Sequence, residues 1–484
     1  MSNSGLFSIA RSALLAQQQT LQTISQNIAN AQTPGYSRQE AVLSATPPVR
    51  FSYGSVGTGV EVATIIRKRD VLLDDTYRSA NGNTSQSELH RDLLGQMEGV
   101  FGEPSDSGLS NALGQLWSAF SDLATSPSSG AAKAVVQQTG RQVAQLLNQD
   151  DTQITQQRTS SLARLTNTVA DINNTAQQIA ALNQQIITTE SNGNTANDLR
   201  DARDLKVDSL SKLAGVRVLN QPNGSTTVLI GNSTLVDGNT ARTLTLQLVP
   251  PVPAPAVTPS DVPVKITLGT SQDALYPLGG ELKALTDYVN TDIPAIRGRL
   301  DALASQLASG VNAQHVQGYT FTGNTIPGTA AGNFFDAGTV LNPVRASTIK
   351  LDAIIDADSS KIASSRDPNA PTDGVNATAM SNLRGFATSV SYVPVVGSPP
   401  ETGSFDSFFR DTMTKLGISV KTETDNATIG RTLTDQADQR RLSVSGVNTD
   451  EELSHMMQVQ QAYQAASKLV KAADEMLQTL LQII

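Results

Sequence analysis

The sequence contains no cysteine in 484 residues, which excludes disulfide bonds, thiol nucleophiles and thiolate metal sites. Aromatic residues make up only 4% of the chain, so its hydrophobic cores must be built mainly from Leu, Ile, Val and Ala. Charged residues make up only 16%, against a typical ~25%. Gln, Ser, Thr and Asn take up the difference, so neutral polar groups are expected to cover much of the surface.

Long apolar runs are also missing. No run approaches the ~18 apolar residues that a membrane-spanning helix requires, and no basic segment precedes an apolar one after Met1. The sequence therefore predicts neither insertion into a membrane nor a cleaved signal peptide. An extracellular location would require an export route that uses no cleaved signal.

The net charge of −9 argues against a nucleic-acid-binding protein, because a phosphate-binding surface needs clustered Lys and Arg. The one basic run, residues 67–69, is followed closely by Asp70, Asp74 and Asp75. We interpret this run as a solvated surface.

Catalytic and metal-binding motifs are absent from the sequence. His90, His315 and His455 stand far apart, and no spacing of histidines suits a metal ion. A capping or turn role is predicted for His315, and a packing or polar flanking role for His455. We therefore expect no metal, no cofactor and no enzymatic activity.

The densest group of charges lies in residues 197–204, where Asp198, Asp201 and Asp204 alternate with Arg200 and Arg203. Paired carboxylates can serve a glycosidase. Their spacing of three on one helix, with arginines between them, is more typical of a salt-bridged helix surface. We adopt the surface interpretation.

Residues 4–31 are predicted to form one amphipathic helix. Its first apolar row is spaced by seven residues: Phe7, Leu14, Leu21 and Ile28. The companion row lies three residues further on: Ala10, Gln17, Ile24 and Ala31. Two such rows are typical of a coiled-coil seam. The helix should end before Pro34 and Gly35, which suit the central positions of a type II turn.

The C-terminal residues predict a second long helix, from Thr449 to the end of the chain. Three adjacent rows form its apolar face: Met456, Tyr463, Val470, Leu477 and Ile484; Val459, Ala466, Ala473 and Leu480; and Leu469, Met476 and Ile483. Thr449 and Glu452 are predicted to form a capping box at its start. So wide an apolar face indicates burial in a layer of several helices. We expect this face to be exposed to solvent in a single chain and to become buried when copies stack.

The middle of the chain is mostly helical. A row spaced by seven, Leu165, Ile172, Ile179 and Ile186, predicts a long helix that ends at Asn192-Gly193. Further helices are predicted at 86–98, 108–124, 130–149, 197–214 and 280–317, and helical periodicity resumes near Phe405. Strands are predicted at 216–219, 226–230, 243–248 and 264–268, with turns at Asn223-Gly224 and Asp237-Gly238 and a proline-rich excursion at 250–263.

The predicted fold is mainly α with β insertions. It comprises a terminal coiled-coil core domain, a helical-bundle domain, and small inserted β domains. The expected boundaries are 1–45 with 445–484 for the core domain, 46–215 with 271–325 and 401–444 for the bundle, 216–270 for a β insertion, and 326–400 for a β-rich outer domain. The bundle range includes a β-hairpin segment that follows residue 46.

Segment 25–39, SQNIANAQTPGYSRQ, resembles the N-terminal signature of bacterial flagellar axial proteins. The residues that carry the motif are Asn27, Asn30, Thr33, Pro34, Gly35 and Tyr36. Segments 57–62 and 444–466 are similar to further parts of the same proteins. In the middle, residues 197–204 (NDLRDARD), 279–285, 312–319 and 333–335 resemble the hook-associated protein 1 family.

This resemblance implies a non-enzymatic structural subunit at the first junction layer between flagellar hook and filament. It implies self-assembly through the terminal helices, with the hook protein and the second junction protein as neighbours. It also implies a cytoplasmic export chaperone on the C-terminal helix, and type III export without a cleaved signal to the extracellular flagellum.

Other functions remain open at this stage. Another axial flagellar protein, such as a hook, distal rod or second junction protein, would share the terminal helices, but hook and rod subunits would be mostly β between them. A secreted coiled-coil adhesin or a type III translocon tip would not need two matched termini. A cell-wall hydrolase would need an acid pair or a catalytic histidine at a suitable site.

Overall fold

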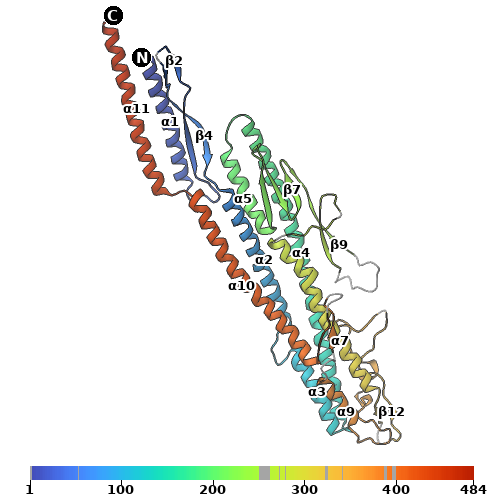
Figure 1. Ribbon diagram of the computed structural model, residues 1–484. Helices are drawn as coiled ribbons and strands as arrows, with labels where there is room; N and C mark the ends of the chain where they lie inside the picture. Colours follow the sequence, from blue (N-terminus) through green and yellow to red (C-terminus); the bar gives the residue numbers. More distant parts are fainter. Residues whose placement is uncertain are drawn as a thin grey trace.

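The computed structural model is a long molecule with both termini at one end (Figure 1). It describes residues 3–483 except 53, 250–261, 272, 278, 322–324, 341, 386–389 and 395–398, and it leaves undescribed the side chains of residues 3, 4, 477 and 480–483. We call the end that carries the termini the terminal unit, and the remainder the body. None of the described helices is both long and apolar enough to cross a membrane.

The terminal unit pairs α1 (Asn3–Ala29) with α11 (Thr449–Ile483). A hairpin of β1 (Gln39–Ala45) and β4 (Val60–Arg67) packs against α1, and β2 (Val49–Phe51) pairs with β3 (Gly54–Val56) at the hairpin tip. The boundary expected at residue 45 was therefore misplaced, because it cuts through this hairpin.

The body is a bundle of long helices. The most extensive packing between two helices of the body is that of α2 (Val71–Phe101) against α10 (Phe405–Ser445). Helix α10 runs back toward the terminal unit (Figure 1). The other helices of the bundle are α3 (Leu109–Thr125), α4 (Gly130–Ser191), α5 (Asn197–Leu213), the short α6 (Gly280–Asp287) and α7 (Ile293–His315). The mainly α fold with small β sheets is confirmed.

Several helix boundaries differ from the expected ones. The helix predicted at 86–98 begins at Val71, because Asp70 caps it by accepting from the backbone N–H groups of Leu72 and Leu73. The helix predicted at 130–149 and the apolar row ending at Ile186 belong to one helix of 62 residues. The helix predicted at 280–317 is interrupted by a π-helical turn at 288–292.

Several of the buried aromatic residues form one cluster where α3, α10 and the segment 334–335 meet. Trp117 lies 5.5 Å from Phe405, and Phe120 lies 5.6 Å from Phe334, between ring centroids. The buried leucine and isoleucine rows of α2 and α4 extend this cluster into one continuous core. At this end of the bundle, large rings add to a core that is otherwise built from aliphatic side chains.

Two small sheets lie against α4. The first is antiparallel and contains β5 (Val216–Asn220), β6 (Thr226–Ile230), β7 (Ser233–Asp237) and β8 (Thr240–Ala241), with turns at both predicted Asn-Gly and Asp-Gly positions. The second pairs β9 (Leu244–Leu248) with β10 (Val264–Leu268). Strands β7 and β8 were not predicted. Most of the proline-rich excursion, residues 250–261, lies outside the described residues.

Segment 326–400 is not the β-rich domain that was expected. Its described residues form mostly turns and irregular backbone, with two short helices, α8 (Ala353–Ala357) and α9 (Val375–Asn382). The strands there are short and pair with strands outside the segment: β12 (Thr329–Ala330) with β11 (Tyr319–Thr320), and β13 (Val390–Tyr392) with β14 (Glu401–Gly403). Buried side chains of this segment, such as Phe334 and Ile349, complete the bundle core instead of forming a separate one.

His315, the last residue of α7, holds two loops against the bundle. Its Nδ1 lies 2.7 Å from the carbonyl oxygen of Gly332, and its Nε2 accepts a hydrogen bond of 3.0 Å from the backbone N–H of Ala363. Burial lowers the pKa of His315 to about 4. The side chain is therefore a buried neutral link between loops.

The contribution of His315 to stability should consequently fall as the solution becomes acidic. Between pH 6.5 and pH 4 the unfolded chain binds a proton at His315 that the folded chain does not, so this contribution should drop by about 2 kcal/mol from pH 7 to pH 5. Asp150 and Asp301, whose pKa values burial raises to about 7 and about 6, act in the opposite direction in the same interval, so the drop is measured as the difference in urea unfolding between the natural chain and a His315 variant at the two pH values. His315→Gln should be less stable at pH 7 and lose less on acidification, whereas an equal loss in the variant would contradict the assignment.

Candidate assembly site at the base of the terminal helices

The seam between α1 and α11 uses small side chains. On α11 the buried residues spaced by seven are Val459, Ala466 and Ala473, and Ile24 on α1 is buried as well. Small residues let two helix backbones approach closely, so this row is the contact within one chain. The second of the three predicted C-terminal rows is therefore the one that faces α1.

The remaining predicted interface residues are only partly covered. Half-buried positions are Leu14, Leu21, Ile28, Met456 and Val470. Phe7 and Tyr463 are exposed, and so are Leu469 at 57% and Met476 at 43%. The side chains of Leu477 and Leu480, and all of Ile484, lie outside the described residues. One chain thus leaves an apolar face of α11 open.

The axial-protein motif forms a tight turn that closes α1. Gly35 has a φ of +81°, and the N–H of Tyr36 donates to the carbonyl of Thr33 over 3.2 Å, as a type II turn requires. The hydroxyl of Thr33 lies 3.2 Å from Oδ1 of Asn30. Pro34 and Gly35 therefore hold the positions expected from the sequence.

Asn27 is the centre of what we call the junction network. Its Nδ2 donates to the carbonyl of Gln39 at 2.8 Å and to Glu452 at 3.0 Å, while its Oδ1 accepts from the Gln39 N–H and from the Tyr36 hydroxyl. The amide is fully buried and uses both its donors and its acceptor. Asn27 thus joins α1, β1 and α11 at a single point.

Glu452 is buried on α11 and also accepts from Nε of Arg38 at 2.7 Å. The capping box predicted for Thr449 and Glu452 is therefore wrong. Asn448 caps the helix instead, with its Oδ1 accepting from the N–H groups of Asp450 and Glu451. Glu452 turns away from the helix start because two donors of the N-terminal segment hold it.

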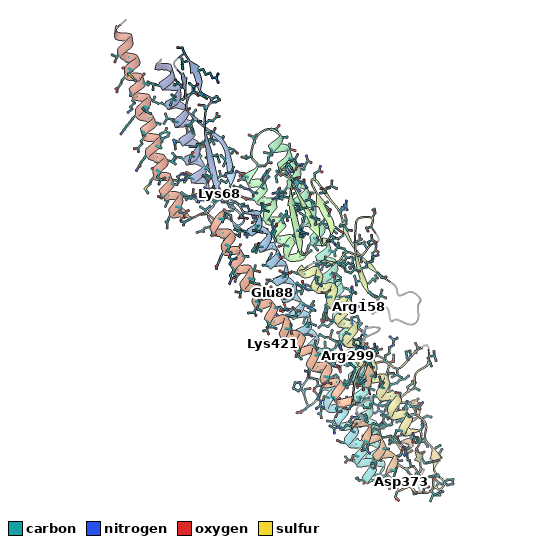
Figure 2. All side chains as sticks on the ribbon, viewed as in Figure 1. Lys68, Glu88, Arg158, Arg299, Asp373 and Lys421 are labelled. Carbon is teal, nitrogen blue, oxygen red and sulfur yellow. The ribbon has the colours of Figure 1, made fainter. Side chains whose placement is uncertain are left out.

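The basic run at 67–69 is not a solvated surface. The side chains of Arg67 and Arg69 are only 11% and 12% exposed, while Lys68 between them points outward and pairs with Glu40. Arg67 is the last residue of β4, and Arg69, two residues further on, reaches the same carboxylate, Asp204. Figure 2 shows Lys68 at the point where the terminal unit meets the body.

The carboxylates predicted to lie on a helix surface receive these arginines. Arg67 contacts Asp201 at 2.6 Å and Asp204 at 3.0 Å, and Arg69 contacts Asp204 at 3.2 Å. Together with Asp74 and Arg203, these residues form a buried group that we call the charge cluster. The surface interpretation of Asp201 and Asp204 was therefore wrong, because the strand that covers them is distant in sequence.

Asp204 is the most strongly held member of the charge cluster. Burial by itself would raise its pKa, but Arg203, Arg69 and Arg67 outweigh that effect and lower the pKa of Asp204 to about 2. Asp201 reaches further and accepts from both the backbone N–H and the hydroxyl of Ser37, at 3.0 and 2.7 Å. The turn after α1 is thereby anchored to α5.

These contacts fix the terminal unit on the body. The described residues contain no group of three His, Asp or Glu side chains suited to a metal ion. His455 is half-buried on α11, beside the junction network. The geometry serves to set the direction in which α1 and α11 leave the body.

Comparison with known proteins shows which family has this sequence and architecture. Residues 94–335 match the model of the flagellar hook-associated protein FlgK helical domain. The chain is 30% identical over 499 residues to flagellar hook-associated protein 1 of Bacillus subtilis (strain 168), covering 97% of this chain and 96% of that protein. The chain belongs to the flagellar hook-associated protein 1 family. It is also 25% identical to the Escherichia coli (strain K12) protein of that name, over 99% of this chain and 100% of the relative.

A solved structure of the hook-associated protein 1 family has the same fold. The flagellar hook junction protein FlgK from Burkholderia pseudomallei superposes with a TM-score of 0.62 at 18% identity, covering 77% of this chain and all of that one. Two further models, of basal body rod proteins, match residues 7–36 and 438–483. Those ranges include most of α1 and all of α11, the helices that form the seam.

Family membership confirms the resemblance stated from segments 25–39 and 197–204, and with it a structural role in the flagellum. The match to a hook-associated helical domain separates this chain from the hook and rod alternatives. Sequence reasoning missed the roles of Ser37, Arg38 and Gln39, which directly follow the axial motif. Their only signal was their inclusion in the recognised segment.

Proposed function

We propose that this chain forms the first junction layer between flagellar hook and filament, and that copies assemble through α1 and α11. The observation that carries the proposal is the apolar face that α11 leaves open in one chain, with Leu469 and Met476 exposed. Burying a large apolar side chain contributes about 1.5–3 kcal/mol, so several in a row favour contact with another copy.

The assembling unit in this proposal is 1–67 with 445–484, which extends the range expected from the sequence by one hairpin. The N-terminal part of its surface supports close packing because few charges interrupt it. Among residues 1–58 the charged side chains are Arg11, Arg38, Glu40 and Arg50, and Arg38 is already paired with Glu452. Neighbouring helices can therefore meet with little electrostatic repulsion.

The partners proposed are further copies of this chain, the hook protein on one side and the second junction protein on the other. A cytoplasmic chaperone would cover the open face of α11 before export, since that face would otherwise favour aggregation. Export would use the flagellar type III route without a cleaved signal, to an extracellular position in the flagellum. In this proposal the chain has no enzymatic activity, binds no nucleic acid and does not insert into a membrane.

Deletion of the gene tests the proposed position. We expect cells that carry hooks but no filaments and release flagellin into the medium, because filament subunits have no layer on which to assemble. Electron microscopy of the cells and immunoblots of the medium would show this, and an intact copy on a plasmid should restore filaments. Normal filaments in the deletion strain would contradict the proposal.

A further inference from the structure

The open face of α11 is a row of residues without charge. Successive residues of an α-helix are about 100° apart, so a residue three positions after a seam residue lies about 60° to one side of the seam. Leu469 and Met476 follow the seam residues Ala466 and Ala473 in this way. The members of the row are all exposed: Ala462, Ala465, Leu469, Ala472 and Met476. Its alanines allow the backbone of another helix to approach closely.

A second apolar face lies on the other side of the same seam. Tyr463 and Val470 come four positions after seam residues, which places them about 40° to that side. On α1, Leu14 comes four positions after the buried Ala10. Because the two helices are antiparallel, displacements from the seam in the same rotational sense put residues on the same side of the pair (Figure 1). We call this second face the paired rows: Phe7, Leu14 and Leu21 of α1, and Met456, Tyr463 and Val470 of α11.

The two faces stand at the same height on opposite sides of the helix pair. Asn27 of α1 donates to Glu452 of α11 at the base of the pair, which fixes how the helices are aligned. Leu14 and Ala465 lie equally far above this bond, each about 20 Å along its helix. Within one chain the faces point away from each other and cannot meet. Two different faces on opposite sides of a subunit are the requirement for a head-to-tail contact that repeats from copy to copy.

We propose that the open face of α11 in one copy packs against the paired rows of a second copy. Leu469 and Met476 are only two half-covered side chains, far less than the ~800 Å² per partner that a stable contact buries, so a copy held on both faces is bound more strongly than one held on a single face. Neither face contains a charged residue, so both lose water at little cost. The inference rests on the proposed self-assembly and states which faces meet.

Site-specific photo-crosslinking on isolated hooks tests which faces meet. Cells lacking the natural gene would produce the full chain with Tyr463→p-benzoylphenylalanine, whose side chain reacts under ultraviolet light with the groups that it touches. We expect a product of two chains, in which mass spectrometry finds the label joined to Leu469, Ala472 or Met476 of the second copy. The same label at Leu248, an exposed leucine of β9, is the control and should not react with those residues.

The label at Tyr463 could also report a different contact. A label joined to the paired rows of the second copy, or only to a different protein, would overturn the inference. The absence of a two-chain product from hooks that carry normal amounts of the chain would do the same. In each case the proposed function would stand, because the chain would still occupy the hook. Absence of the natural chain from hooks would instead refute the proposed function.

Charged substitutions give an independent measurement. Phe7→Glu with Tyr463→Glu changes only the paired rows, at two positions that are exposed in one chain. It should reduce the amount of chain retained on isolated hooks at least tenfold, as Leu469→Glu with Met476→Glu should for the open face. If open faces met each other, the variant of the paired rows would be retained at the natural level, and that result would overturn the inference.

Opposite charges separate a lost contact from a folding defect. A chain with Phe7→Glu, Tyr463→Glu, Leu469→Lys and Met476→Lys presents acidic side chains on one face and basic side chains on the other. Because these faces meet between copies, this chain should be retained at least threefold better than the chain with Phe7→Glu and Tyr463→Glu alone. Two further substitutions would not repair a folding defect. Equal retention of the two chains would contradict the pairing of these faces.

Discussion

Replacing Asp204 by alanine should lower the free energy of unfolding by about 3–5 kcal/mol, because it leaves buried arginines without their shared partner. Arg67 would retain Asp201 and Arg69 would retain Asp74, but Arg203 would keep only uncharged acceptors, the carbonyl of Gly224 and Oδ1 of Asn183. Few surface substitutions cost as much as 1 kcal/mol, so the effect should be unmistakable.

Urea unfolding of the purified monomer at pH 7, followed by circular dichroism, would measure the loss. Glu40→Ala is the matched control, because it removes an ion pair between two exposed side chains, Glu40 and Lys68, and should cost well under 1 kcal/mol. Equal stabilities of the two variants would show that the charge cluster contributes no more than a surface pair.

Acid should reproduce part of this loss in the natural chain. The pKa of Asp204 is depressed to about 2 from an ordinary value near 3.8, so its stabilising contribution is complete above the ordinary value and is lost as the pH falls through that interval. The loss due to His315 occurs at higher pH, between about 6.5 and 4. The two groups therefore weaken the fold in separate pH ranges.

Converting the open face of α11 to a charged one should abolish assembly without unfolding the chain. Leu469→Glu with Met476→Glu places two carboxylates where another copy is proposed to pack, and burying unpaired charges there is prohibitive. In one chain both side chains are exposed, so the stability of the monomer should change by less than about 0.5 kcal/mol. Cells with this variant should swim no better than the deletion strain.

Swarming in soft agar and electron microscopy of the cells would record the outcome. Leu248→Glu, which adds a charge at an exposed leucine of β9 far from the terminal unit, is the control and should leave filaments intact. Normal filaments on cells with the double variant would contradict assembly through this face. Loss of filaments accompanied by an unfolded monomer would point instead to a role of these residues within one chain.

Local signals predicted the helices well because their causes are local. The row from Leu165 to Ile186 is fully buried in α4, and the helix ends at Ser191, next to the predicted break at Asn192-Gly193. The turn at Pro34 and Gly35 formed as expected because the φ preferences of these two residues suit its central positions. The prediction of a β-rich domain at 326–400 was wrong, because a Gly- and Pro-rich composition does not specify which neighbours the short segments of this region contact.

The candidate site was predicted only in part. The rows on the terminal helices were recognised, yet their periodicity did not reveal that Val459, Ala466 and Ala473 would form the seam within one chain. Glu452 matched a capping box by spacing, but Asn27 and Arg38, more than four hundred residues away, hold its carboxylate. Contacts at that sequence separation leave no periodic signal.

The amino-acid sequence by itself determined the helical character of the chain, the two apolar terminal helices and membership of a flagellar family, because periodicity, turn residues and recognisable segments are properties of neighbouring residues. Only the tertiary structure decided that Arg67, Arg69, Asp201 and Asp204 are buried and which face of α11 remains open. The physical reason is that burial depends on which surfaces fold together. A charged residue on a strand or helix has the same local pattern whether water or an opposite charge faces it.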